Sequence, residues 1–394
     1  MKELYILTNS PGEVSGWVRP TANAMAEARL GASVTLAVLP CPYASGMEKR
    51  YGEEIRGVDE AMTFKSLWAA RAPKGGRRLV LQMGGDPMFG AALSAKLRAR
   101  WAIYTARPRW RSRVDRYFVP DERSAERFRK ARVAENKFTV TGNLMFDSVP
   151  EVCASRAELK KEFGVPDGEE AVAFLPGSRP FEYRGGVGFF VRAAMKVLET
   201  GKKYNAFFPI APTVDEDILE RGLEDAGLSW IGGRPEEIIW NGPGRIRFIR
   251  GDGFRVIKAS RLAVALPGTN NLQIASLGVP LLMVAPLNEA ENIPLDGLPG
   301  LIPLSMPGAR KLKRRLVMWF NSREKFVSLP NRLAGVDIVP EHRGIMTPDM
   351  VADLVISLLD SPERLKKITD NYSRLSFERG AAVKIASAVA EMLG

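Results

Sequence analysis

Short apolar runs alternate with amphipathic stretches along most of the chain. Uninterrupted apolar runs of this length predict buried strands. They are Leu4–Thr8, Val34–Leu39, Leu79–Met83, Ala102–Thr105, Tyr117–Val119 and Phe138–Thr141 in the first half, and Ala171–Leu175, Ala206–Ile210, Ile246–Ile249, Leu262–Leu266 and Leu281–Val284 in the second. Apolar residues at helical spacing predict helices between most of them, among them Thr21–Leu30, Val187–Leu198, Val214–Ala226 and Asn270–Leu277. This alternation predicts an α/β fold built on parallel, doubly wound sheets.

The alternation falls into two series, which predicts two Rossmann-like domains. Turn residues and a charged helix at Arg156–Phe163 separate the two series within Pro150–Pro166. We therefore expect one domain at residues 1–155 and a second at residues 156–375. Residues 286–309 are rich in Pro and Gly and predict cleft-lining loops. Further helices are expected at Pro348–Leu359, Pro362–Ser376 and Ala381–Leu393.

Composition narrows the classes of function. A chain of 394 residues with 45% hydrophobic and 26% charged residues is typical of a folded protein of two domains. Its two cysteines cannot make a disulfide framework, so we expect a cytoplasmic protein. The single histidine, His342, excludes a His-rich metal centre and argues against a Ser-His-Asp triad. No apolar run approaches the ~20 residues of a membrane-spanning helix.

The net charge of +12 is concentrated in two clusters. Between Lys96 and Arg132 the chain has thirteen Lys or Arg against four Asp or Glu. A second cluster, Arg310–Arg315, is followed by Trp319 and Phe320. Such patches suit an anionic membrane surface, a phosphorylated acceptor or nucleic acid, and a solvated basic face is equally compatible with them. No nucleic-acid-binding signature accompanies the charge, so we expect no specific nucleic-acid partner.

A run of small and polar residues, residues 9–16, follows the first predicted strand. Small residues let the backbone turn sharply and approach a ligand at the carboxyl end of a parallel sheet. Tight turns use the same residues for structure alone, and the run has neither a dinucleotide fingerprint nor a P-loop lysine. The candidate site residues here are Ser10, Glu13, Ser15 and Gly16.

A carboxylate, Asp86, follows the strand predicted at Leu79–Met83. At a strand end it could act as a general base on an acceptor hydroxyl. It could equally cap the next helix, with Pro87 at the first helical position. The residues alone slightly favour the cap, and the two interpretations are compatible.

Two glycine turns follow predicted strands of the second domain, at Leu175–Arg179 and Leu266–Asn271. The first offers backbone amides and a guanidinium, and the second offers amides at a helix N-terminus. Two such turns can hold both phosphates of a pyrophosphate, although ordinary strand-to-helix turns use the same residues. The candidate phosphate-binding residues are Gly177, Ser178, Arg179, Gly268, Thr269 and Asn270.

Four segments together resemble the lipid-A-disaccharide synthase family of glycosyltransferases, in order along nearly the whole chain. They are its opening loop (Gly12–Gly16), its Leu-Pro-Gly-Ser-Arg motif (Leu175–Arg179), its Leu-Pro-Asn-x-Leu-Ala-Gly stretch (Ser328–Gly335, followed by Val339–Glu341) and its closing Gly-Ala segment (Gly380–Ala382). By pattern alone, the third predicts only a loop entering a helix. The resemblance implies a GT-B fold in which residues 376–394 return to the first domain.

The resemblance also implies a reaction and residue roles. An inverting transferase would move an acylated glucosamine from a UDP-linked donor to a lipid monosaccharide phosphate, with no cofactor and no metal. Asp86 and Glu13 would be the catalytic residues, with Asp86 as the base. Arg179 would hold the diphosphate, and Gln273 and Asn331 would lie in the donor pocket. Arg107, Arg109 and Asn143 would face the acceptor. The implied partners are the UDP-sugar, the lipid phosphate and the anionic inner face of the cytoplasmic membrane; the oligomeric state stays open.

The chain also departs from the family pattern. Trp17 and Gln273 replace an Asp and a Glu, Asn143 replaces the His of a Gly-His pair, and Ala106–Arg111 is more basic and less aromatic than its counterpart. A relative with another acceptor therefore stays open. So do a UDP-sugar 2-epimerase, a non-catalytic nucleotide-sugar-binding protein and, last, binding to nucleic acid through charge alone.

Overall fold

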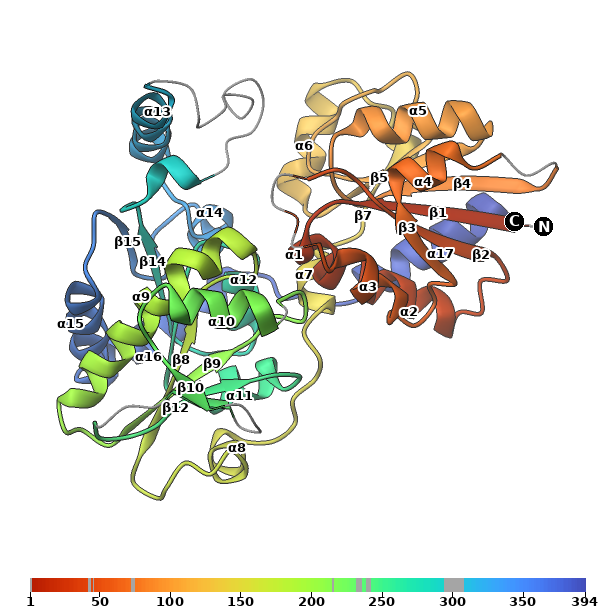
Figure 1. Ribbon diagram of the computed structural model, residues 1–394. Coiled ribbons are helices and arrows are strands. Elements are labelled where there is room, and N and C mark those ends of the chain that lie inside the picture. Colours follow the sequence, from red (N-terminus) through yellow and green to blue (C-terminus); the bar gives the residue numbers. More distant parts are fainter. Residues whose placement is uncertain are drawn as a thin grey trace. The chain divides into compact units, whose positions relative to one another are not determined.

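The computed structural model describes residues 2–41, 44, 46–71, 75–214, 216–231, 236–238, 242–293 and 308–394. The chain forms two compact units (Figure 1). The N-terminal unit comprises Met1–Ser148 and Phe377–Gly394, and the C-terminal unit comprises Val149–Ser376. Each unit holds one sheet with helices on both faces, which confirms the predicted α/β fold class.

The sheet of the N-terminal unit is parallel, with the strand order β3-β2-β1-β4-β5-β6-β7. Because β1 lies between β2 and β4, a topological switch point lies at the carboxyl ends of β1 and β4. The strands are β1 (Lys2–Thr8), β2 (Ser33–Val38), β3 (Glu60–Thr63), β4 (Arg77–Gln82), β5 (Arg100–Tyr104), β6 (Arg116–Val119) and β7 (Phe138–Val140). The helices are α1 (Pro11–Glu13), the π-helix η1 (Val14–Val18), α2 (Arg19–Glu27), α3 (Glu48–Glu53), α4 (Phe64–Ala69), α5 (Pro87–Leu97), α6 (Glu122–Lys130), η2 (Glu135–Lys137), α7 (Leu144–Asp147) and α17 (Ala381–Leu393).

Alternate residues of β1 build two hydrophobic cores on opposite faces of this sheet. Leu4 and Ile6 pack with α2 and α17, and Tyr5 and Leu7 pack with α5 and α6. The last helix is therefore part of the N-terminal core, where Figure 1 shows its blue ribbon among red and orange elements. Asp147 fixes the start of α17, because its carboxylate accepts hydrogen bonds from Gly380 N (2.7 Å) and Ala382 N (2.6 Å).

The sheet of the C-terminal unit has the order β10-β11-β12-β9-β8-β13-β14-β15, with β10 and β11 antiparallel to their neighbours. Its switch point lies between β8 and β13. The strands are β8 (Glu170–Leu175), β9 (Tyr204–Pro209), β10 (Trp230–Ile231), β11 (Glu236–Ile238), β12 (Ile246–Ile249), β13 (Leu262–Ala265), β14 (Leu281–Pro286) and β15 (Glu341–Gly344). The helices are α8 (Arg156–Glu162), α9 (Pro180–Glu199), α10 (Glu216–Glu224), α11 (Gly253–Ala259), α12 (Asn270–Ser276), η3 (Ala290–Asn292), α13 (Ala309–Arg323), α14 (Leu329–Ala334), α15 (Pro348–Leu359), α16 (Pro362–Asn371) and η5 (Tyr372–Arg374).

Two consecutive phenylalanines of β9 pack on opposite faces of this sheet. Phe207 packs toward Val256 of α11, whereas Phe208 stacks on Phe174, which contacts Phe190 of α9. Aromatic side chains of adjacent strands thus fix the register of β8 against β9.

Every strand predicted from the sequence is present, with ends shifted by a few residues. The sequence patterns missed β3, β10, β11 and β15, which are short, and β15 is the polar run Glu-His-Arg-Gly. Of the predicted loop at residues 286–309, the first part contains η3, and residues 294–307 lie outside the described residues.

Candidate active site

Two loops meet at the switch point of the N-terminal sheet. Leu7 of β1 pairs with Gln82 of β4, so the loops that follow these strands start side by side. The carboxylate of Glu13, from the first loop, packs directly against Gly84 of the second: a Cβ on Gly84 would lie 2.1 Å from Glu13 Oε2. With a φ of +144°, only glycine fits at position 84.

Asn9 lies at the same place, one residue beyond β1. Its Oδ1 is buried, has no hydrogen-bond partner among the described residues, and would lie 3.1 Å from a Cβ on Gly84. Buried polar atoms are normally satisfied, so this amide oxygen marks Asn9 as a candidate site residue. Asn9 lies in the predicted loop but is not among the candidate residues predicted there; the available signal was an Asn directly after a buried strand.

Asp86 both caps α5 and faces solvent. Its Oδ1 accepts a hydrogen bond from Met88 N (2.8 Å), which confirms the N-cap interpretation. The residue is exposed, so the cap leaves its carboxylate accessible to a substrate hydroxyl.

Gln82 holds the loop that carries Asp86. It is fully buried, and its Nε2 donates to Gly84 O (2.9 Å) and to Asp86 O (2.8 Å). The loop is thus tied to β4 on both sides of Gly85. Gln82 is not among the residues predicted from the sequence; the available signal was an amide inside an otherwise apolar strand.

The predicted loop residues Ser10, Ser15 and Gly16 serve the local fold around η1. Ser10 N donates to Glu13 Oε2 (3.4 Å), and Ser15 Oγ donates to Pro11 O (2.9 Å). Gly16 is buried under Met145 of α7, whose Cε would lie 2.1 Å from an added Cβ. A π-helical turn is uncommon and is often found at functional sites.

The predicted acceptor residues lie on loops of the same sheet. Arg107 and Arg109 follow β5 and are exposed, and neither guanidinium makes a hydrogen bond or ion pair within the described part of the chain. Asn143 is the N-cap of α7, where its Oδ1 accepts from Met145 N (3.0 Å). The Tyr104 hydroxyl accepts from Leu144 N (3.2 Å), and burial raises its pKa. Trp17 meets the Tyr104 ring edge-on at 5.2 Å, so Trp17 is part of the loop packing.

The two glycine turns of the C-terminal unit lie at its switch point. Leu175 of β8 pairs with Ala265 of β13, so the turns at Gly177–Arg179 and Gly268–Asn270 begin side by side. This is the edge at which open α/β sheets bind ligands.

Glu182 of α9 occupies the first of these turns. Its Oε2 accepts from Ser178 N (2.7 Å) and Arg179 N (3.0 Å), and its Oε1 pairs with Arg179 NH1 (3.1 Å). The prediction that these two amides are open to a diphosphate is therefore wrong. Burial raises the pKa of Glu182, which Arg179 and the N–H donors oppose. The sequence signal for this arrangement was a Glu three residues after Arg179, which is the spacing of a capping box.

The second turn is organised by Asn271, which is fully buried. Its Nδ2 donates to Leu266 O (3.0 Å) and to Asn270 Oδ1 (3.0 Å), which orients the Asn270 side chain. Thr269 precedes α12 and is half-buried, and so is Gln273 within that helix.

Asn331 holds the fold together and does not line a donor pocket. It is fully buried; its Oδ1 accepts from Ile338 N (2.8 Å) and Val339 N (2.9 Å), and its Nδ2 donates to Val339 O (3.0 Å) and Glu341 Oε2 (3.3 Å). The amide therefore uses its full hydrogen-bonding capacity on the segment that leads into β15. The prediction that this side chain contacts the donor is wrong.

Helix α13 presents a surface that is both basic and apolar. It carries six Lys or Arg and no Asp or Glu. Ala309, Lys313 and Val317 form its buried side. Leu312 and Trp319 are 48% and 46% exposed, and the Arg323 guanidinium lies 4.2 Å from the Trp319 ring.

Two features bear on membranes and metals. Among the described residues, no helix combines the length and apolar character needed to cross a bilayer. The same residues contain no group of three His, Cys, Asp or Glu side chains placed to hold a metal ion.

The chain is similar in sequence to curated lipid-A-disaccharide synthases. It is 27% identical to that of Syntrophus aciditrophicus over 240 residues, which are 61% of this chain and 52% of the relative. It is also 27% identical to that of Myxococcus xanthus, over 78% of this chain and 73% of the relative. The chain thus matches about half the length of the first relative. No protein-family model matches it. The resemblance inferred from the motifs is confirmed, at the level of a divergent relative.

Solved structures support the fold. A UDP-GlcNAc 2-epimerase from Neisseria meningitidis bound to UDP-GlcNAc superposes with a TM-score of 0.57 at 13% identity, covering 99% of both chains. A complex of S. aureus MnaA with UDP gives a TM-score of 0.55 at 12% identity, covering 99% of this chain and 96% of the other. These likenesses confirm the predicted fold of two Rossmann-like domains, the GT-B fold.

Proposed function

We propose that the chain is a GT-B glycosyltransferase that uses a UDP-linked sugar and, more specifically, that it transfers an acylated glucosamine to a lipid monosaccharide phosphate. The observation that carries the proposal is the exposed Asp86 carboxylate, on a loop that buried Gln82 holds through the Asp86 backbone carbonyl at the switch point of the N-terminal sheet. Relatives named lipid-A-disaccharide synthases support the choice of reaction.

The proposed reaction assigns one step to each switch point. Asp86 takes the proton of the acceptor hydroxyl while that oxygen attacks the anomeric carbon of the donor, and UDP leaves with inversion. The C-terminal turns support the negative charge of the leaving diphosphate through Thr269, Asn270 and the Arg179 guanidinium. Glu182 competes for the amides of its turn, so we assign the diphosphate mainly to the Gly268–Asn270 turn.

The test compares two aspartates that have the same structural task. Asp121 caps α6 at the end of β6, accepting from Ser124 N at 2.6 Å, as Asp86 caps α5 at the end of β4. Asparagine caps a helix as well as aspartate does, so Asp86→Asn and Asp121→Asn should both fold. We expect transfer to fall by about a hundredfold or more in Asp86→Asn alone, with UDP binding unchanged. Equal turnover in both variants would remove Asp86 as the base.

Donor binding is tested separately by calorimetry with UDP, and with ADP as the control nucleotide. The proposal expects selective binding of UDP, weakened in Arg179→Ala. A chain that does not prefer UDP contradicts the assignment to sugar-nucleotide chemistry.

A UDP-sugar 2-epimerase is the second candidate, because solved structures named UDP-N-acetylglucosamine 2-epimerases, including the Neisseria meningitidis enzyme, share this fold. An epimerase converts its UDP-sugar without an acceptor. Incubation with UDP-GlcNAc alone therefore separates the two functions: an altered sugar nucleotide supports epimerisation, and its absence together with acceptor-dependent UDP release supports transfer.

We assign the contact with an anionic membrane to the α13 surface. Leu312 and Trp319 lie about two helical turns apart on the exposed side, where lysines and arginines can meet lipid phosphates. Trp319→Ala should weaken co-sedimentation with phosphatidylglycerol vesicles but not with phosphatidylcholine vesicles. Trp68→Ala, which alters a tryptophan of similar exposure (44%) in the N-terminal unit, is the control. Equal losses in the two variants would contradict the assignment.

A further inference from the structure

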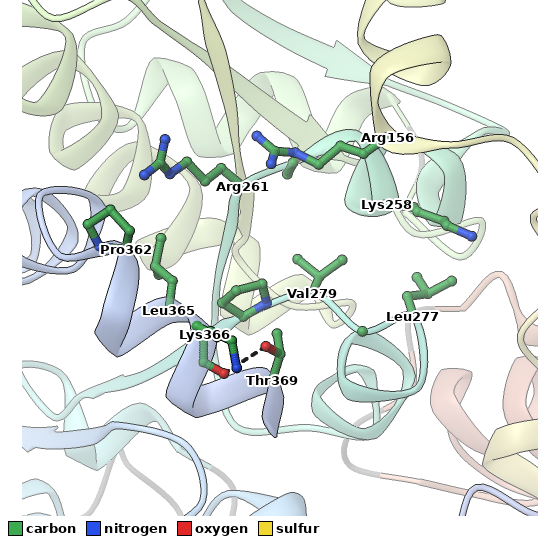
Figure 2. A pocket seen from close by; sticks show the side chains of 12 residues that line it. Arg156, Lys258, Arg261, Leu277, Val279, Pro362, Leu365, Lys366 and Thr369 are labelled. Atoms are coloured by element: carbon green, nitrogen blue, oxygen red, sulfur yellow. Dashed lines mark hydrogen bonds between the residues drawn. The ribbon is translucent and has the colours of Figure 1, made fainter. Parts of the chain in front are cut away.

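A pocket of about 410 Å³ opens at the amino-terminal edge of the C-terminal sheet, opposite the glycine turns. Lys258, Ser260 and Arg261 line it just before β13, and residues 277–280 line it just before β14. The first residue of α8, Arg156, and residues of α16 complete it (Figure 2). Its volume is within the range of small-molecule sites, about 300–1,000 Å³.

The pocket is lined by four cations and no carboxylate: Arg156, Lys258, Arg261 and Lys366. Figure 2 shows Arg156 and Arg261 along one wall, with Leu277, Val279 and Leu365 across from them. One side of the pocket therefore offers guanidinium donors, and the other offers an apolar surface.

The positive charge of this pocket is only partly compensated. Glu170 is shared by Arg156, by Lys160 (3.2 Å) and by Arg261 (3.7 Å). Burial raises the pKa of Glu170, but the opposing effect of Arg156 and Lys160 is larger. The pKa of Glu170 therefore lies below its ordinary value, and the carboxylate stays ionised. Lys366 pairs with Asp370 at 2.6 Å.

Lys258 donates to the carbonyl of Val152, which carries no charge. Within the described part of the chain, five cations, Lys160 included, thus face two carboxylates, and three positive charges remain. A phosphate monoester would supply up to two negative charges and acceptor oxygens for both guanidinium groups.

We propose that this pocket binds a small phosphorylated ligand. The phosphate lies on Arg156 and Arg261, and the remainder of the ligand packs on Leu277, Val279 and Leu365. The site is separate from the switch points and stands whether or not the chain is a transferase. A soluble sugar phosphate and a lipid phosphate share this chemistry, and the choice of probe separates them.

The experiment titrates the full chain by calorimetry with glucose 1-phosphate and with dihexanoyl phosphatidic acid. Arg156→Gln and Arg261→Gln should each weaken binding of the preferred probe by about tenfold or more, since each removes a charge-assisted hydrogen bond. Arg255→Gln is the matched control: Arg255 also pairs with a glutamate, is similarly exposed (39% against 41% for Arg156) and does not line the pocket.

Lys366→Gln is a second test, because its side chain is 75% exposed and its loss leaves the fold intact. It too should weaken the probe, and UDP binding should not change in any of these variants. Failure of both probes to bind at millimolar concentration overturns the proposal. So does an equal loss in Arg255→Gln, which would show attraction by net charge alone. Loss of transfer in Asp86→Asn, or of UDP binding in Arg179→Ala, would leave this site untouched.

Discussion

Removing the Asn331 amide should destabilise the C-terminal unit strongly, whether or not a nucleotide is bound. In Asn331→Ala, the N–H groups of Ile338 and Val339 and the carbonyl of Val339 lose their partner. A buried backbone group without a partner costs about 1–3 kcal/mol. Water entering the vacated space offsets part of this cost, so we expect the free energy of unfolding to fall by about 3–5 kcal/mol. For a domain of this size, that lowers Tm by roughly 6–20 °C.

Urea unfolding followed by circular dichroism measures this loss, with calorimetry of UDP binding on the same samples. Asn292→Ala is the control, because Asn292 is exposed and, within the described residues, its side chain makes one hydrogen bond, to Glu289 (2.8 Å). It should change stability by less than about 0.5 kcal/mol. An Asn331→Ala chain of unchanged stability that no longer binds UDP would refute the structural role and restore a donor contact.

Three further outcomes are expected. Gln82→Met, which removes both hydrogen bonds to the Asp86 loop, should lower kcat by about tenfold with KM for the donor unchanged, measured in the transfer assay. Asp147→Ala leaves the first amides of α17 without their acceptor, and should lower the stability of the N-terminal unit by about 1–3 kcal/mol and expose α17 to limited proteolysis. Burial, aided by a nearby arginine, lowers the pKa of His342 in the folded chain below its ordinary value of 6.5. On acidification the unfolded chain therefore binds this proton at a higher pH than the folded chain does, so stability is lost as pH falls below about 6.5. His342→Gln should lose less stability on acidification; a pH-stability curve parallel to that of the native chain would contradict this.

The sequence predicted the fold class well because both switch points are built from local signals. Buried strands are recognised in the sequence as apolar runs, and Gly-rich turns mark their carboxyl ends. The motif at Asp86 was predicted as either a cap or a base, and the structure supplies both a cap and an exposed carboxylate. Short strands such as β15 were missed because pairing to β14, and not its own polar residues, makes it a strand.

The side-chain partners could not be predicted in the same way. Nothing in the motif around Asn331 indicates that residues 338–341 fold over it and use all its hydrogen bonds. Glu182 was in reach of a sequence argument, because a Glu in the first turn of a helix commonly accepts from the amides just before that helix. The basic pocket draws its residues from segments as distant as Arg156 and Lys366, so no sequence window contains it.

The packing of α17 in the N-terminal core sets an order of events during synthesis. Ile385, Val389 and Leu393, with the alanines of the same helix, complete a core whose remaining members lie before residue 149. A ribosome finishes all residues of the C-terminal unit before it releases this helix. Domains usually fold in the order in which they are made. Here the N-terminal unit is begun first, but its core can be completed only after the C-terminal unit has been made. A chain permuted to start at Phe377 would make that unit continuous and should let it fold first.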